Sequence, residues 1–279
     1  MKMQSAEQIG VCSWSLQSTG AEDLRDKVQA VGVRLVQLGL TAHRGDHGVW
    51  GGVQETLGEA GITIISGMFS TIGEDYSTPE TIRVTGGIVP DQYWDENWEL
   101  AQNAAATAEG MGLKYVMSHA GFLPHEPSDP SFEKLIGRII SIADMFADHG
   151  LTLNLETGQE HSDTLLAFIG ELRTRGADNV MINFDPANMI MYDMDEPVGA
   201  LRQLAPHVRG VHVKDARRTK VKGEWGEEVI VGTGEVDWAE FVQVLADADF
   251  EGAYIFEREA GDKRVGDIRA GVANLAMVM

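Results

Sequence analysis

The sequence contains a single cysteine among its 279 residues and no long apolar run. Cys12 cannot form a disulfide bond within the chain, which favours a reducing compartment. No run approaches the roughly 18 consecutive apolar residues that a membrane-spanning helix needs, so we expect no membrane association. The first ten residues, MKMQSAEQIG, lack the apolar core of a signal peptide. These absences together predict a cytoplasmic protein.

Basic side chains are also scarce. The chain has 22 Lys and Arg residues against 43 Asp and Glu residues, which gives a formal net charge of −21 at pH 7. Nucleic acids and anionic membranes are bound largely through Lys and Arg, so this charge disfavours both as partners. Hydrophobic residues make up 43% of the chain, and no linker or low-complexity tract divides it. We therefore expect a single folded domain over residues 1–279.

Short apolar and β-branched runs alternate along the chain with segments whose apolar residues recur at helical spacing. The runs expected to be strands cover residues 9–15, 33–40, 62–70, 113–120, 151–157, 180–186, 208–215 and 252–259. Alternating strands and helices are typical of a parallel sheet. Eight strands in about 250 residues predict a single α/β domain with the closed (β/α)₈ TIM-barrel fold. An open doubly wound sheet is the alternative, but no glycine-rich phosphate-binding motif follows the first run.

Two local features refine this expectation. Residues 71–92 lack either pattern, and an irregular segment of that length after the third strand predicts a lid or the rim of a pocket. Asp237, with Glu240 three residues later, predicts the N-cap of a helix.

Four expected strands carry a potential metal ligand at or near their carboxyl ends, namely Glu156, Asp185, His212 and Glu257. Taken singly, such an acid more often caps a helix or pairs with a basic residue, and His212 alone would be a hydrogen-bonded core histidine. In a barrel, however, the carboxyl ends of all strands meet at one face. Three carboxylates converging there would repel one another unless a cation lay between them. Three carboxylates and an imidazole suit Mn²⁺, Mg²⁺ or Co²⁺, and Zn²⁺ also fits.

Other polar residues occupy the same strand ends. Trp14 and Gln37 lie near the ends of the first two runs, and His119 lies near the end of the fourth, where it either orients a substrate or bonds a backbone carbonyl. Lys214 lies two residues after His212. The basic residues after it, including Arg217 and Arg218, form either a solvated face or a loop that meets a phosphate group.

At these residues the chain resembles the xylose-isomerase-like TIM-barrel family of sugar and sugar-phosphate isomerases and epimerases. The matching stretches are NLETGQE, NFDPANMIMY, GVHVKDA, WGEEVIVGTGEVDW and FEREAG, within residues 154–261. The resemblance implies one divalent ion held by Glu156, Asp185, His212 and Glu257. It also implies that Glu156 and Glu257 exchange protons with a substrate carbon from opposite sides.

The chain departs from the ketose epimerases of that family at two points. Those enzymes carry a histidine shortly after the metal-binding aspartate, where this chain has Asn188. They also carry an arginine after the metal-binding histidine, for which Arg217 and Arg218 are both candidates. With Trp14 and His119, these residues are the expected substrate contacts. Lys214 is expected to act as an acid or to stabilise an enolate.

The sequence thus predicts a metal-dependent sugar or sugar-phosphate isomerase or epimerase that transfers a proton next to a carbonyl. The runner-up is a metal-dependent lyase or hydrolase acting on 3-oxo-glycosides, or a keto-inositol dehydratase. An endonuclease-type phosphodiesterase would need a basic groove, and a non-catalytic sugar-binding barrel would not need Glu156 and Glu257. The expected partner is a small carbohydrate, and a homodimer is a further expectation because such barrels often pair through their helices.

Overall fold

The computed structural model describes residues 6–40, 50–124 and 128–279. Its centre is a closed barrel of eight parallel strands, which confirms the predicted fold. Around the barrel the strand order is β1-β10-β7-β6-β5-β4-β3-β2. The strands are β1 (Ile9–Cys12), β2 (Leu35–Gly39), β3 (Thr63–Met68), β4 (Tyr115–Ser118), β5 (Thr152–Glu156), β6 (Val180–Phe184), β7 (Val208–Val213) and β10 (Tyr254–Phe256). Each overlaps one of the eight expected runs.

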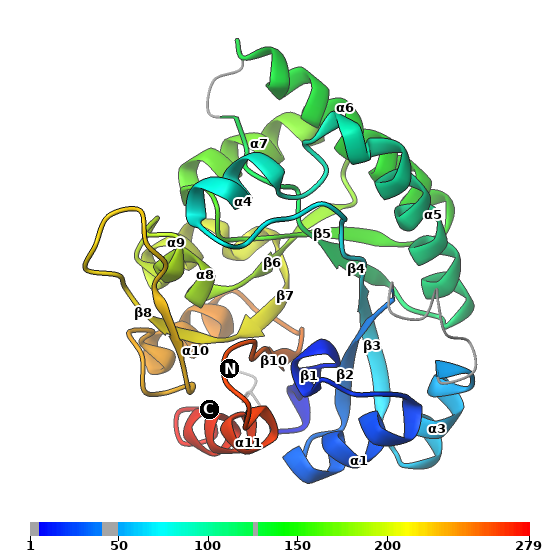
Figure 1. Cartoon of the computed structure of the whole chain (residues 1–279), viewed down its shortest axis with the longest axis vertical. Coiled ribbons are helices and arrows are strands. Elements are labelled where there is room, and N and C mark those ends of the chain that lie inside the picture. Colours follow the sequence, from blue (N-terminus) through cyan, green and yellow to red (C-terminus); the bar gives the residue numbers. More distant parts are fainter. Residues whose placement is uncertain (1–5, 41–49, 125–127) are drawn as a thin grey trace.

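Helices surround the barrel (Figure 1). They are α1 (Ala21–Val31), α3 (Val53–Glu59), α4 (Pro79–Thr85), α5 (Trp94–Gly110), α6 (Pro130–Asp148), α7 (Ser162–Thr174), α8 (Pro186–Met191), α9 (Pro197–Leu204), α10 (Trp238–Asp247) and α11 (Arg264–Leu275). Short 3₁₀ turns cover Ala6–Gln8, Trp14–Leu16, Asp91–Tyr93 and Ala205–His207. Within the described ranges, none of the helices combines the length and apolar character needed to cross a bilayer.

Local sequence signals explain where these helices begin. Asp237 caps α10 as expected, because its side chain accepts a hydrogen bond from the backbone N–H of Glu240. Asp129 caps α6 in the same way, and Pro130 occupies the first helical position, where its missing N–H costs nothing. Each of these helices then buries one apolar face, so the main core lies between the barrel and the helices.

The segment over residues 71–92 is less irregular than the sequence indicated. It contains α4, which begins with a reciprocal capping box: Thr81 N–H donates to the Thr78 hydroxyl, and Thr78 N–H donates to the Thr81 hydroxyl. The usual Glu or Gln is absent from the third position, which is why the motif was missed. A backbone hydrogen bond holds the segment beside the end of β4, because Ile88 N–H donates to the carbonyl of Ala120.

A second difference concerns the segment after β7. The sequence predicted one strand over residues 208–215, but the barrel strand ends at Val213, and β8 (Asp215–Arg217) pairs with β9 (Glu227–Val229) in an antiparallel hairpin outside the barrel. Figure 1 shows this hairpin beside α8 and α10. Each of its strands has three residues, which is too few for an alternating pattern to be recognised.

Candidate metal centre

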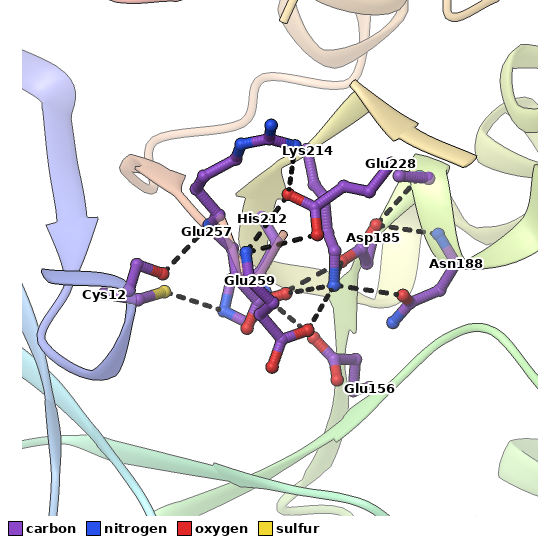
Figure 2. Close-up of polar contacts among 12 residues, drawn as sticks. Cys12, Glu156, Asp185, Asn188, His212, Lys214, Glu228, Glu257 and Glu259 are labelled. Carbon is purple, nitrogen blue, oxygen red and sulfur yellow. Dashed lines mark hydrogen bonds and ion pairs between the residues drawn. The ribbon is translucent and has the colours of Figure 1, made fainter. Parts of the chain in front are cut away.

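The barrel brings the four expected metal ligands together. Glu156 ends β5, His212 lies in β7, and Asp185 and Glu257 follow β6 and β10 directly. One ligand atom from each of the four lies within 4.8 Å of the others, and all four residues are buried. Figure 2 shows their side chains pointing toward one another. The four converge because the carboxyl ends of parallel barrel strands share one rim.

The closest atoms in this cluster have no hydrogen-bond partner. Nδ1 of His212 lies 2.5 Å from Oε1 of Glu156, 3.6 Å from Oε2 of Glu257 and 3.9 Å from Oδ2 of Asp185. Nδ1, Glu156 Oε1 and Asp185 Oδ2 are all buried and unsatisfied among the described residues. Facing lone pairs in a buried site repel one another, and a proton or a cation between them relieves that repulsion. The donor set fits a divalent cation.

Burial and neighbouring charges set the pKa values of three of these residues. Burial raises the pKa of Asp185 well above its usual range, and Lys214 offsets this only in part. Burial also acts to raise the pKa of Glu257, but the positive charges of Lys214 and His212 outweigh it and hold that pKa well below its usual range. For His212, burial lowers the pKa, while Cys12, Glu257 and Glu156 together raise it well above normal. Cation binding must therefore displace protons.

Asp185 serves two purposes at once. Its Oδ1 accepts hydrogen bonds from the backbone N–H groups of Ala187 (2.8 Å) and Asn188 (3.0 Å), so it caps α8. Its other oxygen, Oδ2, faces the cluster. The backbone of Asp185 is held by Thr157, whose hydroxyl accepts from Asp185 N–H at 2.8 Å. The helix cap thus fixes the direction in which the potential ligand atom points.

Trp14 and Lys214 hold Glu257. Trp14 Nε1 donates to Glu257 Oε1 at 2.8 Å, and Lys214 Nζ donates to Glu257 Oε2 at 2.9 Å. Lys214 is itself buried and also contacts Glu259 at 2.7 Å and Asn188 Oδ1 at 3.4 Å (Figure 2). Burial lowers the pKa of Lys214, but Glu257 and Glu259 outweigh this and raise it well above normal. Lys214 is therefore a fixed positive charge at the edge of the centre.

His119 and Asn188 also lie at the site, although their roles stay predictions. His119 Nε2 is 3.1 Å from Glu156 Oε2, so that carboxylate lies between two histidines. Burial lowers the pKa of His119, but Glu156 and Glu74 outweigh it and raise the value. The side-chain amide of Asn188 donates to the Thr157 carbonyl, while its oxygen faces Lys214.

Arg217 and Arg218 do not reach the four-residue centre. Arg217 donates to the Thr233 carbonyl at 3.0 Å, and Arg218 donates to Asp193 Oδ1 at 2.7 Å and to the Asp195 carbonyl at 2.8 Å. Both side chains therefore tie the β8–β9 hairpin to neighbouring loops. A substrate contact by either arginine stays a prediction.

Sequence reasoning missed two polar residues that lie directly after β5. Glu160 is 3% exposed, and its Oε1 has no hydrogen-bond partner within the described part of the chain. Gln159 is also buried: its amide donates to the Tyr192 hydroxyl at 3.3 Å, and its Oε1 is unsatisfied. Both line a small cavity together with His119 and Glu156. The stretch TGQE after the strand end was the available signal, since polar residues there face the open end of a barrel.

Two further carboxylates, for which the sequence predicted no role, brace the site. Glu228 on β9 accepts hydrogen bonds from the backbone N–H groups of Glu259 and Ala260 and from the Arg258 guanidinium. It thereby fixes the loop after β10 that carries Glu257. Asp215 is fully buried. It accepts hydrogen bonds from the backbone N–H groups of Gly232 (2.9 Å), Gly234 and Val236 and from the indole N–H of Trp238. Neither role has a recognisable spacing in the sequence.

Comparison with known proteins agrees with this architecture. The sequence profile of the xylose isomerase-like TIM barrel family matches residues 18–276, so the chain belongs to that family. A xylose isomerase domain protein from Planctomyces limnophilus is 30% identical, with a TM-score of 0.81 over 91% of this chain and 90% of that one.

More distant structures share the fold. A xylose isomerase-like TIM barrel protein from Mycobacterium smegmatis, solved in complex with magnesium, is 16% identical, with a TM-score of 0.74 over 99% of this chain and 98% of that one. An L-ribulose 3-epimerase is 16% identical, with a TM-score of 0.73 over 97% of this chain and 95% of that one.

The uncharacterized protein YihM of Escherichia coli K12 is 31% identical over 100 residues, which is 35% of this chain and only 29% of that protein.

Proposed function

We propose that the protein is a divalent-metal-dependent isomerase or epimerase that moves a proton on the carbon next to the carbonyl of a small sugar. The observation that carries this proposal is the buried cluster of Glu156, Asp185, His212 and Glu257, in which one inward-facing atom of each of the first three lacks a hydrogen-bond partner among the described residues. A divalent ion held there would supply a Lewis acid that polarises an α-hydroxy carbonyl. The family membership and the magnesium-bound relative support the same reading.

The chain's own residues supply the acid–base chemistry. Glu257 stays ionised at neutral pH because Lys214 and His212 lower its pKa, so it is able to accept a proton. Glu156, held between His119 and His212, is the second carboxylate within reach of a substrate at the cluster. Lys214 stays charged and lies 2.9 Å from Glu257, where it can stabilise negative charge that develops on a substrate oxygen.

The adjoining cavity favours a hydroxyl-bearing substrate. Glu160 and Gln159 each present a buried oxygen without a donor. A sugar hydroxyl can donate to the Gln159 oxygen and can either donate to or accept from the carboxyl group of Glu160, whereas an ionised phosphate oxygen would meet the Gln159 oxygen as a second acceptor. We therefore propose that the hydroxyl-rich part of the sugar binds at Glu160 and Gln159.

Solvent hydrogen exchange tests this function. Free ketoses, sugar phosphates and 3-oxo-glycosides are incubated with protein and Mg²⁺ in D₂O, and the signal of the hydrogen next to the carbonyl is followed by NMR. The signal should disappear only when both protein and metal are present. Glu257→Gln should slow this exchange by about 10²-fold or more, since positioned acid–base groups contribute about 10²–10⁴-fold. A loss below about tenfold would show that Glu257 is no more than a ligand.

The exposed Glu227 on β9 supplies the matched control, because Glu227→Gln makes the same chemical change away from the cluster. This variant should retain full exchange. An elimination would remove the same hydrogen but yield an unsaturated product and a departing group, so product analysis separates a lyase from an isomerase. Turnover of a substrate without carbon–hydrogen exchange would refute proton transfer and favour hydrolysis.

A further inference from the structure

Gln37 lies across the barrel interior from the metal centre. It belongs to β2, whereas His212 belongs to β7, and β1 and β10 separate these strands around the barrel. The Oε1 atom of Gln37 nevertheless lies 2.7 Å from Nε2 of His212. Gln37 is 2% exposed and His212 is fully buried, so the contact is sealed from solvent. Its partner atom is the ring nitrogen that does not face the carboxylates.

This contact determines which nitrogen of a neutral His212 carries the hydrogen. An amide oxygen only accepts hydrogen bonds, so Nε2 must be protonated to bond Gln37. A neutral imidazole has a single N–H, which leaves Nδ1 with its lone pair. Nδ1 is the atom that faces Glu156, Asp185 and Glu257. A metal ligand needs that lone pair.

Cys12 contacts both members of this pair. The Cys12 sulfur lies 3.6 Å from Gln37 Oε1 and 3.6 Å from His212 Nε2. The thiol is the donor in its contact with Oε1, so the thiol and the ring N–H share one acceptor oxygen of Gln37.

We infer that Gln37 is a positioning residue whose side-chain oxygen holds His212 in the tautomer and ring orientation that expose Nδ1 to a cation. The inference rests on the metal-dependent function proposed above. Outer contacts of this kind typically contribute about 10–100-fold to metal affinity, because without them the ring rotates or populates the other tautomer. The alternative is that Gln37 only fills space inside the barrel.

Metal titration separates these two roles. Dissociation constants for Mg²⁺ and Co²⁺ are measured by calorimetry for the wild type, Gln37→Met, Gln37→Glu and Cys12→Ser. Gln37→Met keeps the length of the side chain but removes the acceptor, and it should weaken binding by about 10–100-fold. Gln37→Glu keeps an oxygen acceptor and should bind far more tightly than Gln37→Met, whereas Cys12→Ser, which keeps a donor toward Oε1, should bind as the wild type does. Thermal unfolding of the metal-free variants checks that each is folded.

A spectroscopic readout tests the tautomer directly. In the Mg²⁺-loaded protein with ¹⁵N-labelled histidine, His212 should show a hydrogen on Nε2 and none on Nδ1. The Nε2–H resonance should lie far downfield in the wild type and in Gln37→Glu, and should move upfield in Gln37→Met, an effect that mere space filling would not produce. Folded Gln37→Met with wild-type affinity, or a wild-type spectrum without a hydrogen on Nε2, would overturn the inference alone. A wild type that binds neither metal would overturn the proposed function as well.

Discussion

Glu160 should cost the metal-free protein stability as the pH rises, and replacing it by Gln should remove that cost. The side chain is 3% exposed, and one of its oxygens has no hydrogen-bond partner among the residues that the structure describes. Burial raises its pKa from an ordinary 4.5 to about 8, although the backbone N–H groups of Gly158 and Gln159 pull in the opposite direction. The folded protein therefore keeps the carboxyl group protonated over a range in which the unfolded chain has already lost the proton.

The sign and size of the effect follow from this difference. A carboxyl group whose pKa is higher in the folded state binds more protons there, so the free energy of unfolding falls as the pH rises from about 4.5 to about 8 and then levels off. At 1.36 kcal/mol per pH unit, the full range corresponds to about 5 kcal/mol. The effective dielectric constant of about 20 that applies even to buried protein sites reduces this, and we expect about 2–5 kcal/mol. Gln at this position cannot ionise and loses nothing over the same range.

Denaturant unfolding at several pH values in EDTA measures this difference. The free energy of unfolding of Glu160→Gln, minus that of the wild type, should increase by at least about 2 kcal/mol between pH 5 and pH 8.5. Glu227→Gln, the same change at an exposed position of β9, should follow the wild type. Parallel curves for the wild type and Glu160→Gln would refute the reasoning, because they would mean that the carboxyl group ionises as freely in the folded protein as in the unfolded chain.

Two further predictions concern the metal centre and the segment beside it. Asp185→Ala should abolish the rise in melting temperature that Mg²⁺ or Co²⁺ gives the wild type, since only a metal that binds the folded state stabilises it; an undiminished rise would remove Asp185 from the ligand set. Gly87→Ala should lower the stability by more than about 1 kcal/mol, because Gly87 has a φ of +64° and a Cβ there would lie 2.2 Å from the backbone nitrogen of Gly121. Gly137→Ala, in the open middle of α6, should be neutral or stabilising, and equal melting temperatures for the two variants would contradict the packing argument.

The sequence was informative where one repeating pattern extends over a whole element. The eight runs predicted the barrel, and barrel geometry then placed Glu156, Asp185, His212 and Glu257 at one rim, as the structure shows. The β8–β9 hairpin escaped prediction because its strands are three residues long. The sequence could not predict the direction in which a long side chain points. Arg218 contacts Asp193 and not the metal centre, and its place in the sequence is compatible with either contact.

The environment of each carboxylate separates groups that look alike in the sequence. Lys214 Nζ lies 2.9 Å from Glu257 but 4.0 Å from Asp185, so Glu257 receives most of the stabilisation of its charged form. The pKa of Glu257 is accordingly depressed, while burial leaves that of Asp185 elevated. When two acids in one site have pKa values pushed apart, the more acidic one is the group available as a base. Asp185 is also tied to the N-terminus of α8 through its other oxygen, which suits a ligand better than a group that must approach a substrate. The division of roles that we propose, with Glu257 as both ligand and acid–base group and Asp185 as a ligand only, thus follows from the position of Lys214 and from the cap of α8.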